Sequence, residues 1–126
     1  MEVGPGLGFL TEAILDAGGN LTAIELDKRV IPILSKKFAQ EMEKKKFKLI
    51  EGSILHEDLD VLYKQKKYSV IANIPYHITS PIIRKLMSET NNKPEQTILM
   101  VQKEVAQKIC PKTKKGRTKR SILSIS

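Results

Sequence analysis

Short apolar runs alternate with stretches of helical periodicity along most of the chain. The apolar runs have the length and composition of buried β-strands, and a segment with helically spaced apolar residues follows each one. The predicted strands are residues 1–3, 21–26, 47–51, 68–73 and 97–101. This alternation predicts an α/β protein with a doubly wound, mostly parallel sheet and right-handed crossovers. A chain of 126 residues has room for one such core and excludes two full domains.

Individual residues predict where the helices begin and end. An apolar stripe over residues 9–17 predicts the first helix. The second helix contains Pro32, which a helix tolerates only in its first turn, and we expect this helix to fray in the polar run 40–46. Further along, Ser80 is predicted to cap a helix in which Pro81 is the first residue.

Composition excludes a membrane-spanning role and a disulfide scaffold. The chain is 40% apolar and 29% charged, and no apolar run approaches the roughly 20 residues that span a bilayer. Cys110 is the single cysteine, so no internal disulfide can form. The first residues lack the pattern of a secretory signal. We therefore predict a cytoplasmic protein.

Polar residues follow four of the predicted strands, at the point where each strand ends. In an open parallel sheet, ligands bind beyond the carboxyl ends of the strands, close to the position where strand order reverses. We therefore expect these four segments to meet in one crevice. They are Glu2 with Gly4, Gly6 and Gly8, then Glu25, then Gly52 with Ser53, and finally Asn73 to Tyr76.

The glycines of EVGPGLGF distinguish between cofactor classes. Their spacing is G-x-G-x-G, whereas the dinucleotide fingerprint needs a small residue where this chain has Phe9. No Lys-Ser/Thr pair of a P-loop follows either. The loop therefore favours a ligand without a pyrophosphate, such as S-adenosylmethionine, over a nicotinamide cofactor; a tight turn without a ligand is the alternative. Glu25 follows Gly4 by 21 positions, the distance at which an acidic residue accepts hydrogen bonds from both ribose hydroxyls.

The segment NIPY at residues 73–76 has the groups needed to present an adenine amine for methylation. This amine is a poor nucleophile because its lone pair is delocalised into the ring. The side-chain carbonyl of Asn73 and the backbone carbonyl of Ile74, left free by Pro75, could accept its hydrogens and favour a pyramidal nitrogen. Tyr76 would stack on the extruded base. The alternative is a structural Asn-Pro turn with a core tyrosine.

Four motifs together resemble the ribosomal RNA adenine dimethyltransferase family: EVGPGLGFLTEAIL, AIELDKR, NIPYHITSPIIRKL and VQKEVAQKI. That family includes small-subunit rRNA dimethylases, macrolide-resistance methylases and the mitochondrial transcription factor B proteins. The resemblance covers nearly the whole chain in the right order. It implies a Rossmann-like methyltransferase that uses S-adenosylmethionine and transfers two methyl groups to the N6 amine of adenine in ribosomal RNA.

The resemblance also assigns residues and partners. It implies that Asn73, Ile74, Pro75 and Tyr76 receive the target adenine. The cofactor-binding residues that it implies are Glu2, Gly4, Gly6, Gly8, Glu25, Leu26, Ser53, Ile54 and Asn73. The implied partner is ribosomal RNA in a pre-ribosomal small subunit, bound by a monomer without a metal ion. His56 and His77 are not expected to be catalytic, because amine methylation needs no base before methyl transfer.

Three features differ from the family pattern. Ser53 stands where members usually have an aspartate that accepts the cofactor's adenine amine, so we expect weaker cofactor binding. The family's upstream Gly-Gln-Asn-Phe segment is absent, and so are the last sheet strands and the helical RNA-binding domain. We therefore expect residues 1–126 to be a partial catalytic domain, marginally stable and poorly active alone.

The net charge of +8 lies mostly at the C-terminal end. The last 16 residues contain six basic residues and no acidic one, which leaves only +2 for residues 1–110. The six are Lys112, Lys114, Lys115, Arg117, Lys119 and Arg120. Counterion release favours binding of such a segment to phosphates. We expect these residues to contact RNA, with a solvated run of charges as the alternative.

Two other functions remain open at this point. The first is a non-catalytic nucleic-acid-binding relative of the transcription factor B type, which the serine at position 53 favours. The second is a DNA adenine methyltransferase, since the chemistry of Asn73 to Tyr76 would be the same. Binding of the cofactor and methyl transfer to a defined nucleic acid would distinguish these functions.

Overall fold

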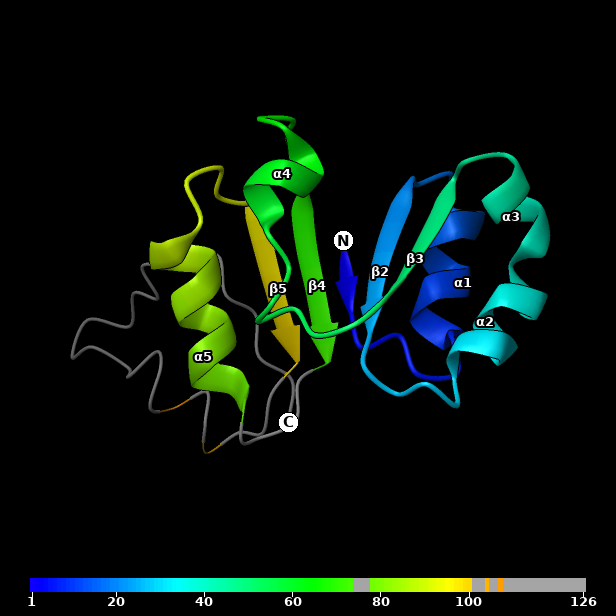
Figure 1. Cartoon of the computed structure of the whole chain (residues 1–126), viewed down its shortest axis with the longest axis horizontal. Helices are drawn as coiled ribbons and strands as arrows, with labels where there is room; N and C mark the ends of the chain where they lie inside the picture. Colours follow the sequence, from blue (N-terminus) through cyan, green and yellow to red (C-terminus); the bar gives the residue numbers. More distant parts are fainter. Residues whose placement is uncertain (74–77, 101–103, 105–106, 108–126) are drawn as a thin grey trace. The chain divides into compact units, whose positions relative to one another are not determined.

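A computed structural model describes residues 1–73, 78–100, 104 and 107 of the chain (Figure 1). The chain divides into two compact units, residues 1–57 and residues 58–126, and each is described by itself. In both units strands alternate with helices, as the sequence pattern predicts. None of the helices among the described residues is long and apolar enough to cross a membrane.

The first unit contains three parallel strands in the order β3-β2-β1. They are β1 (Glu2–Val3), β2 (Leu21–Glu25) and β3 (Phe47–Glu51). The register pairs Leu21 with Phe47 at the amino ends and Glu25 with Glu51 at the carboxyl ends. Glu25 is therefore the last residue of its strand, so its predicted place at the carboxyl edge is confirmed, although the strand ends one residue before the predicted Leu26. The helices α1 (Phe9–Asp16), α2 (Ile31–Lys37) and α3 (Ala39–Glu43) lie beside β2 and β3 (Figure 1).

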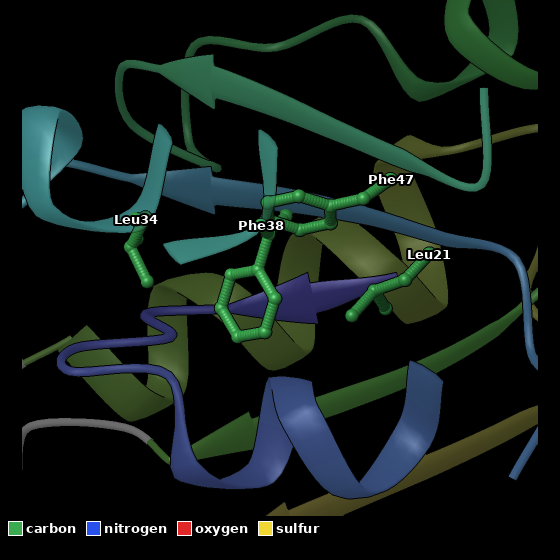
Figure 2. Packing of buried hydrophobic residues seen from close by; sticks show 5 residues of the cluster. Leu21, Leu34, Phe38 and Phe47 are labelled. Carbon is green, nitrogen blue, oxygen red and sulfur yellow. The ribbon is translucent and has the colours of Figure 1, made fainter. Parts of the chain in front are cut away.

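The core of this unit joins these helices to the sheet. The buried cluster consists of Leu21, Ala23, Leu34, Phe38 and Phe47 (Figure 2). The rings of Phe38 and Phe47 meet edge to face, with centroids 5.3 Å apart. Burying a leucine or phenylalanine side chain contributes about 1.5–3 kcal/mol each. This packing fixes β2 and thereby positions Glu25 at its end.

The first helix of this unit is confirmed, and the prediction for the second needs correction. Ile14 of the apolar stripe over residues 9–17 packs against the core from α1, although Phe9 is 75% exposed and Thr11 is the buried residue. The polar run 40–46 does not simply fray, since α3 forms a separate helix after Phe38 leaves the helical conformation at φ −112° and ψ 27°. The partly buried Met42 packs against the core and explains why this polar segment stays helical. Pro32 lies in the first turn of α2, as predicted.

The second unit contains the parallel strands β4 (Ser69–Asn73) and β5 (Gln96–Met100). Its helices are α4 (Leu59–Tyr63), α5 (Thr79–Arg84) and a π-helical turn, η2 (Lys85–Glu89), that continues α5. The side chains with no exposed surface include Val70, Ala72, Ile82, Leu86 and Leu99. The register pairs Asn73 with Met100, so the polar residue is again the last of its strand.

The predicted start of α5 is wrong by two positions. The helix begins at Thr79, so Ser80 is its second residue and Pro81 its third, and Ile78 occupies the capping position without a side-chain hydrogen bond. Proline is tolerated there because the first N–H groups of a helix have no intrahelical acceptor. Farther on, Glu104 and Gln107 are helical.

Candidate functional site

The glycine loop after β1 has a backbone that side chains rarely adopt. Gly4, Gly6 and Gly8 have φ angles of 72°, 58° and 89°. A Cβ atom on Gly8 would lie 2.8 Å from Cε2 of Phe38, so this glycine is required by packing against the core. A Cβ on Gly6 would meet nothing within 4 Å. The loop therefore closes onto α2 at Gly8 and leaves open space beside Gly6.

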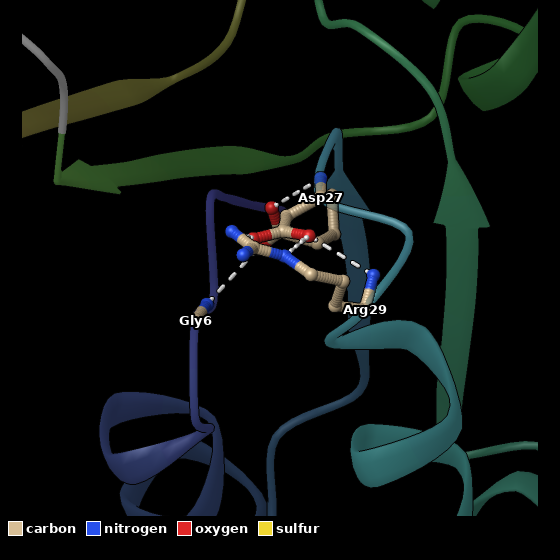
Figure 3. A network of polar contacts seen from close by, with 4 residues as sticks. Gly6, Asp27 and Arg29 are labelled. Atoms are coloured by element: carbon tan, nitrogen blue, oxygen red, sulfur yellow. Dashed lines mark hydrogen bonds and ion pairs between the residues drawn. The ribbon is translucent and has the colours of Figure 1, made fainter.

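Glu25 is held by two backbone N–H groups from different segments. Its Oε2 accepts a hydrogen bond of 3.0 Å from the N–H of Gly6, and its Oε1 accepts one of 2.9 Å from the N–H of Asp27 (Figure 3). The side chain is 8% exposed. These two bonds fix the plane of the carboxylate and leave acceptor capacity on each oxygen. The sequence predicted that Glu25 lies near the glycine loop, but not that the two are hydrogen-bonded.

Asp27 and Arg29 form an ion pair beside Glu25 that the sequence analysis missed. Oδ1 of Asp27 accepts hydrogen bonds from the backbone N–H and the Nε–H of Arg29, at 2.9 and 3.0 Å, and Oδ2 accepts one from Nη2 at 2.8 Å (Figure 3). The side-chain hydrogen bond from Arg29 lowers the pKa of Asp27. The Asp-x-Arg spacing directly after the strand is the sequence signal that could have indicated this pair.

Glu2 is a buried carboxylate and the first residue of β1. It is 3% exposed, and its Oε1 accepts a hydrogen bond of 2.5 Å from the hydroxyl of Thr11. Burial raises the pKa of Glu2 above its ordinary value. The hydrogen bond from Thr11 and the charge of the N-terminal ammonium act in the opposite direction, but burial is the larger effect.

The residues around the glycine loop and Glu25 differ in exposure. Leu7 and Leu26 are 55% and 69% exposed, so both offer apolar surface. Ile54, in contrast, is 3% exposed and lies in the core. The hydroxyl of Ser53 accepts a hydrogen bond of 3.2 Å from the N–H of Leu55. The segment with Ser53 is tied to β2 because the N–H of Gly52 donates to the carbonyl of Glu25 at 2.9 Å.

The predicted substrate and RNA-binding residues are only partly described. Asn73 is exposed at the end of β4, so its amide does not point into a core. Ile74, Pro75, Tyr76 and His77 lie outside the described residues, as do Cys110 and the six basic residues of the C-terminal end. His56 is exposed, and its N–H donates to the carbonyl of Ser53. Among the predicted cofactor-binding residues of the first unit, the structure joins Gly6 to Glu25 by a hydrogen bond, and Gly52, which precedes Ser53, is also bonded to Glu25.

Solved structures with a similar fold are methyltransferases. The 23S rRNA methyltransferase ErmE is 25% identical, with a TM-score of 0.71, and the match covers 86% of this chain and 41% of that chain. A dimethyladenosine transferase from Plasmodium falciparum is 30% identical, with a TM-score of 0.65, over 84% of this chain and 35% of that chain. The fold is therefore that of a Rossmann-like methyltransferase.

Sequence comparisons narrow this class to one family. A ribosomal RNA small subunit methyltransferase A from Dehalococcoides mccartyi is 43% identical over 90% of this chain and 38% of its own length. The protein of the same name from Malacoplasma penetrans is 38% identical over 100% of this chain and 44% of its own length. Residues 1–126 match the family model for ribosomal RNA adenine dimethylase. The chain belongs to the ribosomal RNA adenine dimethylase family and spans less than half the length of these curated relatives.

Proposed function

We propose that this chain supplies the methyltransferase part of an enzyme that transfers two methyl groups from S-adenosylmethionine to the N6 amine of adenine in ribosomal RNA. The observation that carries the proposal is the Glu25 carboxylate, held at the carboxyl end of β2 by the N–H of Gly6. A fixed carboxylate beside an open glycine loop is the arrangement that binds a ribose next to a close backbone approach. The family assignment supports the same reading.

The residues of the first unit fit S-adenosylmethionine chemically. Glu25 has acceptor capacity for both ribose hydroxyls, and the exposed Leu26 offers apolar surface to an adenine ring. Glu2 is a buried carboxylate close to the glycine loop, and a cationic ligand would favour its ionised form. When bound, the cofactor supplies an electrophilic methyl group on a sulfonium. Ser53 would accept the adenine amine.

Asn73 to Tyr76 would present the target base. The side-chain carbonyl of Asn73 and the backbone carbonyl of Ile74 would accept the hydrogens of the adenine amine, and Tyr76 would stack on the base. The exposure of Asn73 at the end of β4 supports this role, because an acceptor for a substrate must reach the surface. No general base is needed, since the methylated nitrogen loses its proton readily.

The proposed substrate is ribosomal RNA within a pre-ribosomal small subunit. The names of the relatives from Dehalococcoides mccartyi and Malacoplasma penetrans support this choice of subunit. We further propose a cytoplasmic monomer in which the C-terminal basic residues, Lys112 to Arg120, contact phosphates through counterion release.

The test is methyl transfer by the full chain to unmethylated small-subunit particles. The chain is incubated with S-adenosylmethionine carrying a labelled methyl group, and the RNA is digested and analysed by mass spectrometry. Because residues 1–126 are expected to be poorly active alone, we expect a low yield of labelled N6,N6-dimethyladenosine, and none with Asn73→Ala. Cofactor binding without any detectable methyl transfer would indicate a non-catalytic nucleic-acid-binding relative. In a parallel reaction with DNA in place of the particles, transfer to adenine there but not in RNA would indicate a DNA methyltransferase.

A further inference from the structure

The loop after β2 holds one side of the Glu25 carboxylate. The N–H of Gly6 reaches Oε2 from the glycine loop, and the N–H of Asp27 reaches Oε1 from the loop that follows the strand. The two bonds come from different segments, so both segments must be in place before the carboxylate has a single orientation. The position of the Asp27 backbone therefore matters for any ligand that Glu25 binds.

Asp27 has its backbone and its side chain engaged in the same turn. Its N–H donates to Glu25, its carbonyl accepts a hydrogen bond of 3.1 Å from the N–H of Val30, and its carboxylate accepts three from Arg29. The bidentate contact with the guanidinium adds directional hydrogen bonds to the charge attraction. Residues 27–30 are thereby held in one conformation.

The pair contributes little to global stability. The side chain of Arg29 is 90% exposed, and exposed ion pairs contribute little to the free energy of unfolding. Its hydrogen bonds are all local, spanning two residues. A contact of this kind orders a short loop more than it holds a fold together. We therefore expect loss of the Asp27–Arg29 pair to affect the orientation of the Glu25 carboxylate more than the stability of the fold.

We propose that Asp27 and Arg29 are positioning residues, whose ion pair fixes the loop after β2 so that the Asp27 N–H orients Glu25 toward the two ribose hydroxyls of the cofactor. This proposal rests on the proposed function, because it concerns the ribose of S-adenosylmethionine. It assigns to Arg29 a role in recognising the vicinal diol without contact to the ligand. Loss of the ion pair should weaken the contribution of the two ribose hydroxyls to the affinity more than the contribution of the other parts of the cofactor.

Lys28 provides a matched control within the same loop. Its Nζ lies 3.9 Å from a carboxylate oxygen of Glu51, and its side chain is 85% exposed. Lys28→Ala removes one positive charge, as Arg29→Ala does, without removing a hydrogen bond to Asp27. Any general effect of charge on ligand binding would therefore appear in both variants, whereas an effect of positioning would appear only in Arg29→Ala.

The experiment compares two ligands on the full chain by titration calorimetry: S-adenosylhomocysteine and its 2′-deoxyribose analogue. We expect Arg29→Ala and Asp27→Asn to weaken binding of S-adenosylhomocysteine about fivefold, which is the size of one lost or misdirected hydrogen bond. Binding of the deoxyribose analogue should change less than about twofold, so the preference for the diol shrinks. Lys28→Ala should keep the affinities for both ligands. Arg29→Lys should bind S-adenosylhomocysteine with an affinity between those of Arg29→Ala and the unsubstituted chain, because lysine keeps the charge but lacks the guanidinium fork.

A second readout needs no ligand. Hydrogen exchange at the backbone amide of position 27, measured by NMR, should be faster in Arg29→Ala than in the unsubstituted chain and unchanged in Lys28→Ala. Preserved diol preference and unchanged exchange in Arg29→Ala would overturn the positioning role while leaving the proposed function in place. Failure of the unsubstituted chain to bind S-adenosylhomocysteine would instead overturn the proposed function, and this proposal with it.

Discussion

Glu25 and Asp60 make the same kind of contact in the two units of the molecule. Each carboxylate accepts hydrogen bonds from two backbone N–H groups. Glu25 accepts from Gly6 and Asp27 in the first unit. In the second unit, Asp60 accepts from Asn91 at 3.2 Å and from Asn92 at 2.7 Å. Hydrogen bonding alone therefore does not distinguish a ligand-binding carboxylate from a structural one.

The surroundings of Asp60 indicate a structural role. The hydroxyl of Tyr68 donates to the carbonyl of Asn92 at 2.7 Å, and the side-chain amide of Asn92 donates to the carbonyl of Lys66 at 3.0 Å. The ring of Tyr68 also stacks on that of Tyr63, with centroids 4.0 Å apart. These contacts join α4 to the segments that precede β4 and β5. The network is satisfied by the protein's own groups.

Position relative to the strand ends is the difference that matters. Glu25 lies at the carboxyl end of β2, next to a loop with open space beside Gly6. The Asp60 network lies before the amino ends of β4 and β5, beside an open cavity of about 480 Å³ lined by polar residues. Parallel sheets bind their ligands at the carboxyl ends of the strands. We therefore expect substitutions of Glu25 to affect binding and those of Asp60 to affect stability.

The largest expected effect is on cofactor affinity. Glu25→Gln keeps the size of the side chain but removes its charge and one acceptor, so we expect binding of S-adenosylhomocysteine to weaken by about 100-fold. Gln keeps one acceptor oxygen for the two backbone N–H groups, so the free energy of unfolding should fall by less than in Asp60→Ala, which removes both acceptors. Titration calorimetry measures the affinity. An affinity within threefold of the unsubstituted chain would contradict the assigned role of Glu25.

Asp60→Ala should produce the opposite pattern. It leaves the N–H groups of Asn91 and Asn92 without their acceptor, and we expect the free energy of unfolding to fall by about 2 kcal/mol. Urea unfolding followed by circular dichroism measures this change. The affinity of the folded protein for S-adenosylhomocysteine should stay the same. If Asp60→Ala instead lost affinity for S-adenosylhomocysteine and kept its free energy of unfolding, Asp60 would be a ligand-binding residue and not a structural one.

The Asp60 network also predicts a pH dependence at high pH. Burial, followed by the charges of Tyr63 and Asp60, raises the pKa of Tyr68 from 10.0 to about 12. The folded protein therefore disfavours the tyrosinate, and this contribution to stability is complete below pH 10 and is lost as the pH rises toward about 12. Tyr68→Phe should lower the free energy of unfolding by about 1 kcal/mol at neutral pH, because the hydrogen bond to Asn92 is lost. Between pH 10 and about 12, the free energy of unfolding of this variant should fall less than that of the unsubstituted chain. If the free energy of unfolding fell equally with pH in Tyr68→Phe and in the unsubstituted chain, Tyr68 would not be the group that titrates.

The smallest expected effect concerns Ser53. The hydroxyl of Ser53 accepts from the N–H of Leu55, a turn contact that an aspartate can also make. Ser53→Asp would add a charged acceptor for the adenine amine, and we expect binding of S-adenosylhomocysteine to tighten about threefold to tenfold. The inosine analogue, which lacks this amine, should gain nothing. An unchanged or weaker affinity for S-adenosylhomocysteine would show that Ser53 does not face the adenine.

The sequence predicted the succession of strands and helices along the chain and the position of Glu25 at the end of a strand. Glu25 could be located because the apolar run that contains it predicts a buried strand with this carboxylate near its end. The spacing of the glycines indicates the loop that faces it. The Asp27–Arg29 pair and the Asp60–Asn92 contact could not be predicted in the same way. The first depends on side-chain rotamers within a short loop, and the second joins residues 32 positions apart.

The errors have the same physical origin. Phe9 belongs to the apolar stripe that predicts α1, but it is exposed, and Thr11 and Ile14 are the residues of this helix that lie in or against the core. Ser80 has the chemistry of a cap, yet α5 begins at the buried Thr79, two residues before the predicted first residue, Pro81. Tertiary packing overrode local preference in both places.

Chemical-shift mapping locates a bound ligand on the chain residue by residue. A ¹⁵N-labelled sample of the full chain is titrated with S-adenosylhomocysteine, and the backbone amide shifts are followed by NMR. We predict the largest changes at Gly4, Gly6 and Gly8 and in the segment from Glu25 to Asp27, with the amides of Asn91 and Asn92 unchanged. Shifts concentrated at Asn91 and Asn92, with none in the glycine loop, would contradict the account.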